Sequence, residues 1–126
     1  MENGGFKELK VWKKAHALVL ETYQLTKSFP DDEKFCLTSQ IRRSVISVAA
    51  NITEGQRKTK KNFSRFLDIA IGSLEETRYY LLLSHDLNFC NDIQFRKLFD
   101  LSSEVGKMLS GLKKSLAPTK NLELKS

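Results

Sequence analysis

The chain is poor in the residues that cross-link, break or anchor a protein. Its 126 residues include only two cysteines, two prolines and two histidines. Cys36 and Cys90 lie far apart without CxxC spacing, which argues against both a disulfide framework and a zinc site. The longest uncharged run, residues 44–53, is about half of the ~20 residues that a membrane span requires. The N-terminus has no apolar stretch typical of a secretory signal. These absences predict a cytoplasmic protein with no membrane contact.

Patterns that mark enzymes are missing as well. The sequence contains no Glu-x-x-His pair of a di-metal helical bundle, no Gly-rich phosphate loop and no GxSxG nucleophile elbow. His16 and His85 are expected toward opposite ends of the molecule, as packing or surface residues. Neither cysteine has an evident base nearby in the sequence, which favours ordinary free thiols. We therefore predict no catalytic residue, no metal, no cofactor and no enzymatic activity.

Four long stretches carry apolar residues at alternating three- and four-residue spacing, which is the period of a helix seam. They predict helices at about 7–28, 32–56, 60–87 and 92–117. Short loops favour antiparallel neighbours. The sequence thus predicts an all-α fold, an antiparallel up-down-up-down four-helix bundle over residues 6–117. Residues 1–5 are expected to be a flexible N-terminus and residues 118–126 a polar tail.

The breaks between these stretches contain residues that end and begin helices. Pro30 stops the first helix, and Asp31 or Asp32 is the expected N-cap of the second. Thr59 is the expected N-cap of the third helix. Asn91 or Asp92 is expected to cap the fourth, which Pro118 ends.

Two of the helices are more apolar than one bundle requires. Residues 45–52 place apolar side chains around most of the second helix, and residues 79–83 are five consecutive large side chains that cannot all point inward. A surplus of this kind is either a thick core or a partner surface. Closed homo-oligomers are a common way to cover it, so we predict self-association.

Basic residues concentrate in three separate segments. Residues 1–17, 50–68 and 107–126 contain fourteen Lys or Arg against five Asp or Glu, a balance of +9. The remaining residues contain seven against ten, a balance of −3, and the two recover the net charge of +6. An up-down topology brings the three segments to one end, which would attract phosphate backbones without reading base sequence. The candidate contacts to RNA or DNA are Lys10, Lys13, Lys14, Arg57, Lys58, Lys60, Lys61, Arg65, Lys113 and Lys114.

A second interpretation of the same charge remains open. Lysine-rich rims often serve only solubility. On that interpretation the protein is a protein-binding adaptor without nucleic-acid contact.

The second helix also carries a stripe of small and polar residues. Ser44, Ser47, Asn51 and Glu54 follow one another at +3, +4 and +3 spacing, which places them on one helix face. Small residues allow close approach of a neighbouring helix, and a buried Glu54 would need a partner such as Arg42, Arg43 or Arg65. Gly55 is expected to let the chain leave the helix. We assign Ser47, Asn51, Glu54 and Gly55 a structural role.

Longer stretches resemble a known family. "LTSQIRRSVISVAANITEG" followed by basic residues and "FSRFLDIAIGSLEETRYYL" resembles the four-helix-bundle family of 23S rRNA intervening-sequence proteins, and "FKELKVWKKAHALVLETYQLTKSFP" is similar to its first helix. The resemblance implies an antiparallel four-helix bundle that assembles as a homopentamer. It also implies likeness to accessory proteins of diversity-generating retroelements, which bind nucleic acid and a reverse transcriptase, and it carries over no catalytic residue. Ala49 stands where the family pattern usually has proline, so the second helix is expected to be straighter.

Overall fold

The computed structural model describes residues 5–118, and within them it contains helices and no strand. A short 3₁₀ helix, η1 (Phe6–Glu8), precedes α1 (Lys10–Thr26). A second one, η2 (Asp31–Glu33), precedes α2 (Leu37–Gly55), and α3 (Lys60–Asp86) and α4 (Asp92–Ser115) follow. The predicted all-α fold of four helices is confirmed. Most of the expected flexible N-terminus and nearly all of the expected polar tail lie outside the described residues.

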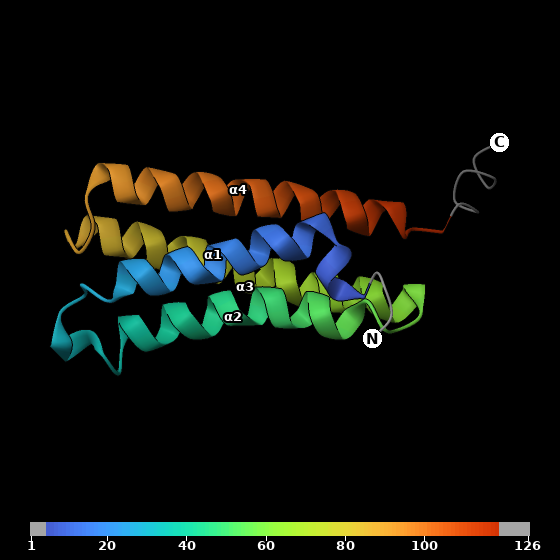
Figure 1. Ribbon diagram of the computed structural model, residues 1–126, viewed down its shortest axis with the longest axis horizontal. Coiled ribbons are helices and arrows are strands. Elements are labelled where there is room, and N and C mark those ends of the chain that lie inside the picture. Colours follow the sequence, from blue (N-terminus) through green and yellow to red (C-terminus); the bar gives the residue numbers. More distant parts are fainter. Residues whose placement is uncertain (1–4, 119–126) are drawn as a thin grey trace.

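The four helices pack side by side, each against its two neighbours in the cyclic order α1, α2, α3, α4. Figure 1 shows successive helices running in opposite directions. As a result, η1, the turn between α2 and α3 and the last turn of α4 all lie at one end of the bundle, on the right of Figure 1. The loop that contains η2 and the connection from α3 to α4 lie at the other end.

The core is built from the apolar seam of each helix, as the spacing predicts. Its largest fully buried apolar side chains come from all four helices and are Leu18, Ile41, Val45, Val48, Ile52, Leu67, Leu74, Leu81, Val105 and Leu109. The most extensive packing is between α2 and α3. This pair therefore fixes the geometry of the turn that joins them.

Two helix starts differ from the prediction. The first helix begins at Lys10 rather than at residue 7, because Phe6–Glu8 forms a separate 3₁₀ turn. The second begins at Leu37 rather than at residue 32, because Asp31–Glu33 forms another. Asp31 and Asp32 consequently lie too early to cap α2, and the expected cap there is wrong. Instead, the Leu37 N–H donates to Glu33 Oε1 at 3.2 Å, which satisfies one of the free donors of the helix start.

The other two caps agree with the prediction. The Thr59 hydroxyl accepts a hydrogen bond from the Asn62 N–H, so Thr59 is the N-cap of α3. Asn91 is the N-cap of α4 and forms a reciprocal capping box with Gln94, with N···O distances of 2.8 and 2.9 Å. At the far end α4 stops at Ser115, ahead of Pro118.

A hydroxyl in the core provides a first testable prediction. Thr22 is fully buried, and its Oγ1 has no hydrogen-bond partner among residues 5–118. An unpaired buried hydroxyl costs about 1–3 kcal/mol. The substitution Thr22→Val keeps the shape and removes that group, so we expect it to raise the free energy of unfolding by about 1 kcal/mol in urea denaturation. A loss of stability would show that the hydroxyl is satisfied in solution.

Candidate nucleic-acid interface

The turn between α2 and α3 is held tightly where it leaves α2, at the helix's last residue, Gly55. A Cβ added to Gly55 would lie 2.6 Å from Phe66 Cβ, closer than real Cβ atoms approach other atoms, and 3.0 Å from Phe63 Cδ1, which is a tight contact. Gly55 therefore lets the end of α2 pack directly against the first turns of α3. It was expected to serve the chain's exit from the helix, but the structure shows a different reason for glycine here: close contact with two aromatic side chains.

The remaining turn residues are hydrogen-bonded on both sides. The Lys58 N–H donates to the Gly55 carbonyl at 2.9 Å, and the Phe63 N–H donates to the Thr59 carbonyl at 2.7 Å. In the same stretch of chain, four basic side chains are exposed on the surface: Arg57, Lys58, Lys60 and Lys61. The backbone of the turn is thus ordered by contacts that do not use its charged groups.

Two further segments bring cations to the same end. Lys10, Lys13 and Lys14 are exposed on the first turns of α1, and Lys114 is exposed on the last turn of α4. Figure 1 places the start of α1 and the end of α4 at the end where α2 turns into α3. Arg65 is exposed two turns into α3. We call this set of segments the basic end. Its described parts, residues 5–17, 50–68 and 107–118, contain twelve Lys or Arg against three Asp or Glu.

Three of the ten candidate cations form ion pairs at their surface positions. Lys14 lies 3.3 Å from Glu104, and Lys58 lies 3.3 Å from Glu54. Lys113 lies 2.5 Å from Asp68, and its side chain is partly exposed. Exposed pairs of this kind are worth at most about 1 kcal/mol, so a phosphate can compete for these lysines. The other seven candidates form no ion pair within residues 5–118: Lys10, Lys13, Arg57, Lys60, Lys61, Arg65 and Lys114.

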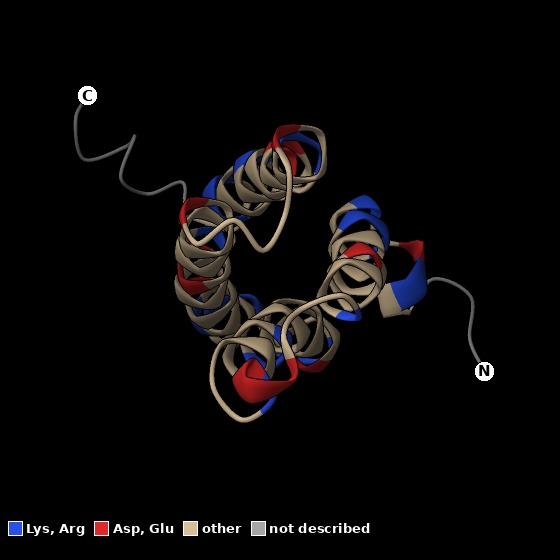
Figure 2. Ribbon diagram, turned by 90° about the vertical axis from the view of Figure 1, so that its left-hand side faces the viewer, with Lys and Arg blue, Asp and Glu red and all other residues tan. Residues whose placement is uncertain are grey.

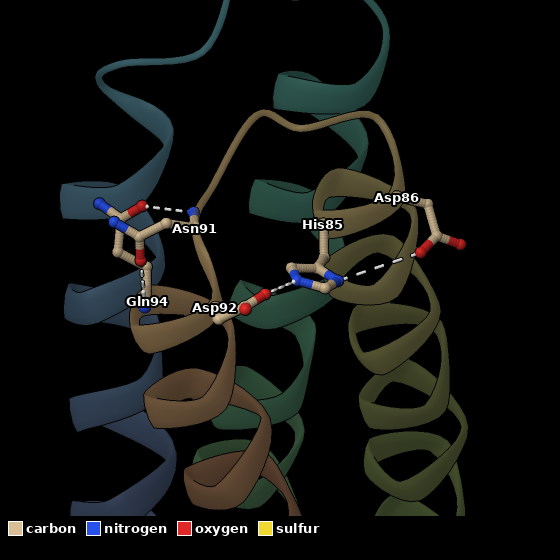
Figure 3. Close-up of polar contacts among 5 residues, drawn as sticks. All are labelled: His85, Asp86, Asn91, Asp92 and Gln94. Carbon is tan, nitrogen blue, oxygen red and sulfur yellow. Dashed lines mark hydrogen bonds and ion pairs between the residues drawn. The ribbon is translucent and has the colours of Figure 1, made fainter.

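The opposite end of the bundle carries acidic residues. Figure 2 views the molecule from this end, where η2 stands out in red beside the start of α2. Figure 3 shows how α3 and α4 meet there: His85 Nε2 lies 2.5 Å from Asp92 Oδ1, and His85 Nδ1 lies 4.0 Å from Asp86. The His85 ring also stacks on Phe95 with centroids 4.6 Å apart. His85 therefore joins the two helices as a packing residue, and the two ends of the molecule differ in charge.

The polar stripe of α2 is largely in contact with α3. Ser44 Oγ lies 2.8 Å from Thr77 Oγ1, and Ser47 Oγ lies 2.7 Å from Ser73 Oγ. Asn51 Nδ2 donates to the Ser47 carbonyl at 2.8 Å and contacts its hydroxyl at 3.0 Å. Small hydroxyl side chains on both helices thus make the close approach that the spacing indicates.

Glu54 does not belong to this contact. It is exposed and pairs with Lys58 one turn later, rather than being buried against Arg42, Arg43 or Arg65. Burial of a carboxylate costs several kcal/mol, and at the last turn of α2 the Glu54 carboxylate avoids this cost because it remains in contact with water. Arg42 instead donates to the Thr26 hydroxyl at 2.8 Å and lies over the Tyr23 ring.

A groove between α3 and α4 was not predicted from the sequence. It has a volume of about 530 Å³, and its polar lining includes Glu75, Arg78, Lys107, Ser110 and Lys114. Arg78 lies outside the three basic segments, in the part of the sequence with a net negative charge, and Lys107 is not among the ten candidate contacts. The spacing of Ile71, Leu74 and Arg78 on α3 was the available signal, because it puts an arginine at the edge of the apolar seam.

Aromatic, sulfur and metal chemistry add little at the basic end. The exposed His16 ring stacks on Trp12 with centroids 4.8 Å apart, while Phe63 packs against the core.

The two cysteines differ in exposure. Cys36 is exposed and Cys90 is buried, and burial raises the pKa of the Cys90 thiol. No group of three or more His, Cys, Asp or Glu side chains within residues 5–118 is placed to share a metal ion. No helix in this part of the chain is both long and apolar enough to cross a membrane.

These features define a small all-α bundle in which the charge is strongly polarised along the helices. More specifically, the chain belongs to the 23S rRNA-intervening sequence protein family, whose model matches residues 7–111. The resemblance seen in the helix motifs is therefore confirmed. A search of curated proteins finds no match.

A solved structure supports the same family. The chain is 28% identical to a protein with unknown function from the S23 ribosomal protein family of Bacteroides thetaiotaomicron VPI-5482, known from a crystal structure. The similarity covers 82% of this chain and 95% of that one, with a TM-score of 0.77. The similarity therefore extends over most of this chain and nearly all of that one, which supports the same helical fold for both.

Proposed function

We propose that this protein is a non-enzymatic, oligomeric scaffold of the cytoplasm that binds RNA or DNA through its basic end without reading base sequence. The observation that carries the proposal is the gathering of cations from three separate segments at one end of the bundle. Phosphate contacts position a protein on nucleic acid but carry no sequence information. Among the described aromatic side chains of the basic end, Trp12 stacks with Phe6 and His16 and Phe63 packs on the core, so the proposal rests on the cations.

Salt dependence tests this proposal directly. If the seven cations without ion pairs each neutralise one phosphate, log K should fall with log salt at a slope of about −5 for single-stranded RNA. Affinity for random-sequence RNA should then drop about 1,000-fold between 50 and 200 mM salt. Fluorescence anisotropy at four salt concentrations measures the slope. No binding at 50 mM salt would contradict the proposal.

The oligomeric part of the proposal comes from the apolar surface. Large apolar side chains remain exposed on the surface of the single chain, most strongly Phe35, Ile93, Leu20 and Tyr79. Exposed apolar area of this kind is commonly covered by a partner. Family resemblance suggests a homopentamer, which a mass measurement in solution, with and without RNA, would distinguish from a monomer.

The same surface favours a second candidate function. A protein-binding adaptor would use these apolar side chains for a partner, for which the family resemblance suggests a reverse transcriptase, and would keep its cations for solubility. Retention of partner binding together with no RNA binding at low salt would select this candidate.

A further inference from the structure

The groove between α3 and α4 differs in chemistry from the other surfaces of the bundle. One wall of the groove is the edge of the apolar seam on α3. The other wall is on α4 and consists largely of serine and glycine: Ser102, Ser103, Gly106, Ser110 and Gly111. Small side chains leave the groove open along α4. Its charged lining consists of Arg78, Lys107, Lys114 and the single carboxylate Glu75, so cations are in excess.

Arg78 is held at one end of the groove by neutral groups. Its Cζ lies 4.0 Å from the centroid of the Phe99 ring, and its Nη1 donates to Ser102 Oγ at 2.9 Å and to Ser103 Oγ at 2.6 Å. The side chain is half-buried, yet within residues 5–118 it forms no ion pair. A partly buried guanidinium normally finds a carboxylate or phosphate. Here its position is fixed while its charge stays uncompensated.

The groove joins the basic end. Lys114, one of the cations of that end, is also part of the groove lining. Ser102 and Lys114 are twelve residues apart on α4, which corresponds to about 18 Å along the helix. A strand stacked as in B-DNA, with a rise of about 3.4 Å per nucleotide, would place about five nucleotides over that length, and a more extended single strand would place fewer. A strand that is bound at the basic end therefore has a continuous cationic path toward Arg78.

We infer that this groove binds the phosphate backbone of single-stranded nucleic acid, with Lys114, Lys107 and Arg78 as successive phosphate contacts. The inference rests on the proposed function and names the form of nucleic acid that the site takes. A DNA duplex is stiff, with a persistence length of about 50 nm, so its backbone does not bend to follow a groove about 18 Å long. A flexible single strand can lie along the groove and bring successive phosphates to cations on both helices.

The double substitution Lys107→Gln/Lys114→Gln tests the inference on two exposed residues whose loss leaves the core untouched. With a fluorescent 12-nucleotide single strand, we expect the salt slope to become shallower by about 1.4 and affinity at 0.15 M salt to fall about tenfold. Arg96→Gln/Lys97→Gln is the matched control, because it removes two exposed cations from the same helix outside the groove. The control should bind the strand as the natural protein does.

A 12-base-pair duplex provides the second measurement. Arg78→Lys keeps the charge but loses the planar contact with Phe99. We therefore expect a lower affinity for the single strand and an unchanged affinity for the duplex. The melting temperature of the Arg78→Lys protein identifies any general loss of fold. Equal weakening of single strand and duplex by Lys107→Gln/Lys114→Gln would overturn the groove, as would unchanged single-strand affinity. If substitutions in the turn at residues 57–61 still abolish binding in that case, the proposed function stands without the groove.

Discussion

Replacement of Arg57, Lys58, Lys60 and Lys61 together by glutamine is expected to remove most of the affinity for RNA. Four phosphate contacts at about 0.7 each make the salt slope shallower by about 2.8, which corresponds to a loss of about 200-fold at 0.15 M salt. All four side chains are exposed, and only Lys58 forms an ion pair, with Glu54 at 3.3 Å. The melting temperature should therefore change little, since such pairs contribute about 0.3–0.5 kcal/mol. Anisotropy and thermal unfolding on the same sample measure both.

A control of equal charge makes this result specific to the basic end. Four exposed cations lie at the other end of the bundle: Lys27, Lys34, Arg96 and Lys97. Their joint replacement by glutamine lowers the net charge by the same four units. RNA affinity should remain near that of the natural protein. An equal loss in both variants would mean that overall charge, rather than its location, determines binding.

The substitution Gly55→Ala is expected to have the largest effect on stability among the described helical glycines. The new Cβ would meet Phe66 Cβ at 2.6 Å, and that atom cannot rotate away because it is attached directly to the backbone. The start of α3 must then shift, and overpacking of this kind costs about 1–3 kcal/mol. This loss should exceed any gain from the higher helix propensity of alanine. Urea denaturation followed by circular dichroism measures the free energy of unfolding.

Gly72 is the matched control for this experiment. It lies inside α3, is exposed, and a Cβ added there would meet no atom within 4 Å. Gly72→Ala should therefore stabilise the protein by about 1 kcal/mol, through helix propensity alone. Opposite signs for the two substitutions support close packing at Gly55. If Gly55→Ala were also stabilising, the contact with Phe66 would have to be looser in solution than described.

The helices could be predicted because local patterns determine them. The apolar spacing gave the four seams, and side-chain chemistry at Thr59 and Asn91 identified two N-caps that the structure contains. The same kind of signal failed at Asp31 and Asp32, because carboxylates can also serve a short 3₁₀ turn, and sequence alone does not tell the two apart. Both helix starts that the prediction misplaced, those of α1 and α2, follow a short 3₁₀ turn, so a start next to such a turn is the least predictable part of this fold.

The candidate site was predictable only where it depends on chain direction. Reversal of direction at each loop brings the three basic segments together, and that needs no knowledge of side-chain contacts. Glu54 was misplaced because a stripe on a helix face does not show where the neighbouring helix ends its contact. Arg78 was missed because its partners, Phe99, Ser102 and Ser103, lie more than twenty residues away in the sequence. The spacing of Ile71, Leu74 and Arg78 indicates only that the arginine lies at the edge of the apolar seam, and it does not show which side chains of α4 it contacts.

The way the turn after α2 is secured has a consequence for how this protein can diversify. Gly55 and Thr59 hold the turn through packing and backbone hydrogen bonds. The side chains at positions 57, 58, 60 and 61 are exposed, and among them only Lys58 forms an ion pair, with Glu54 on the surface. Selection can then alter the charge of those four positions with a change of at most about 0.5 kcal/mol in the free energy of unfolding for each. The fold of the bundle and the charge of this turn can therefore change independently of each other.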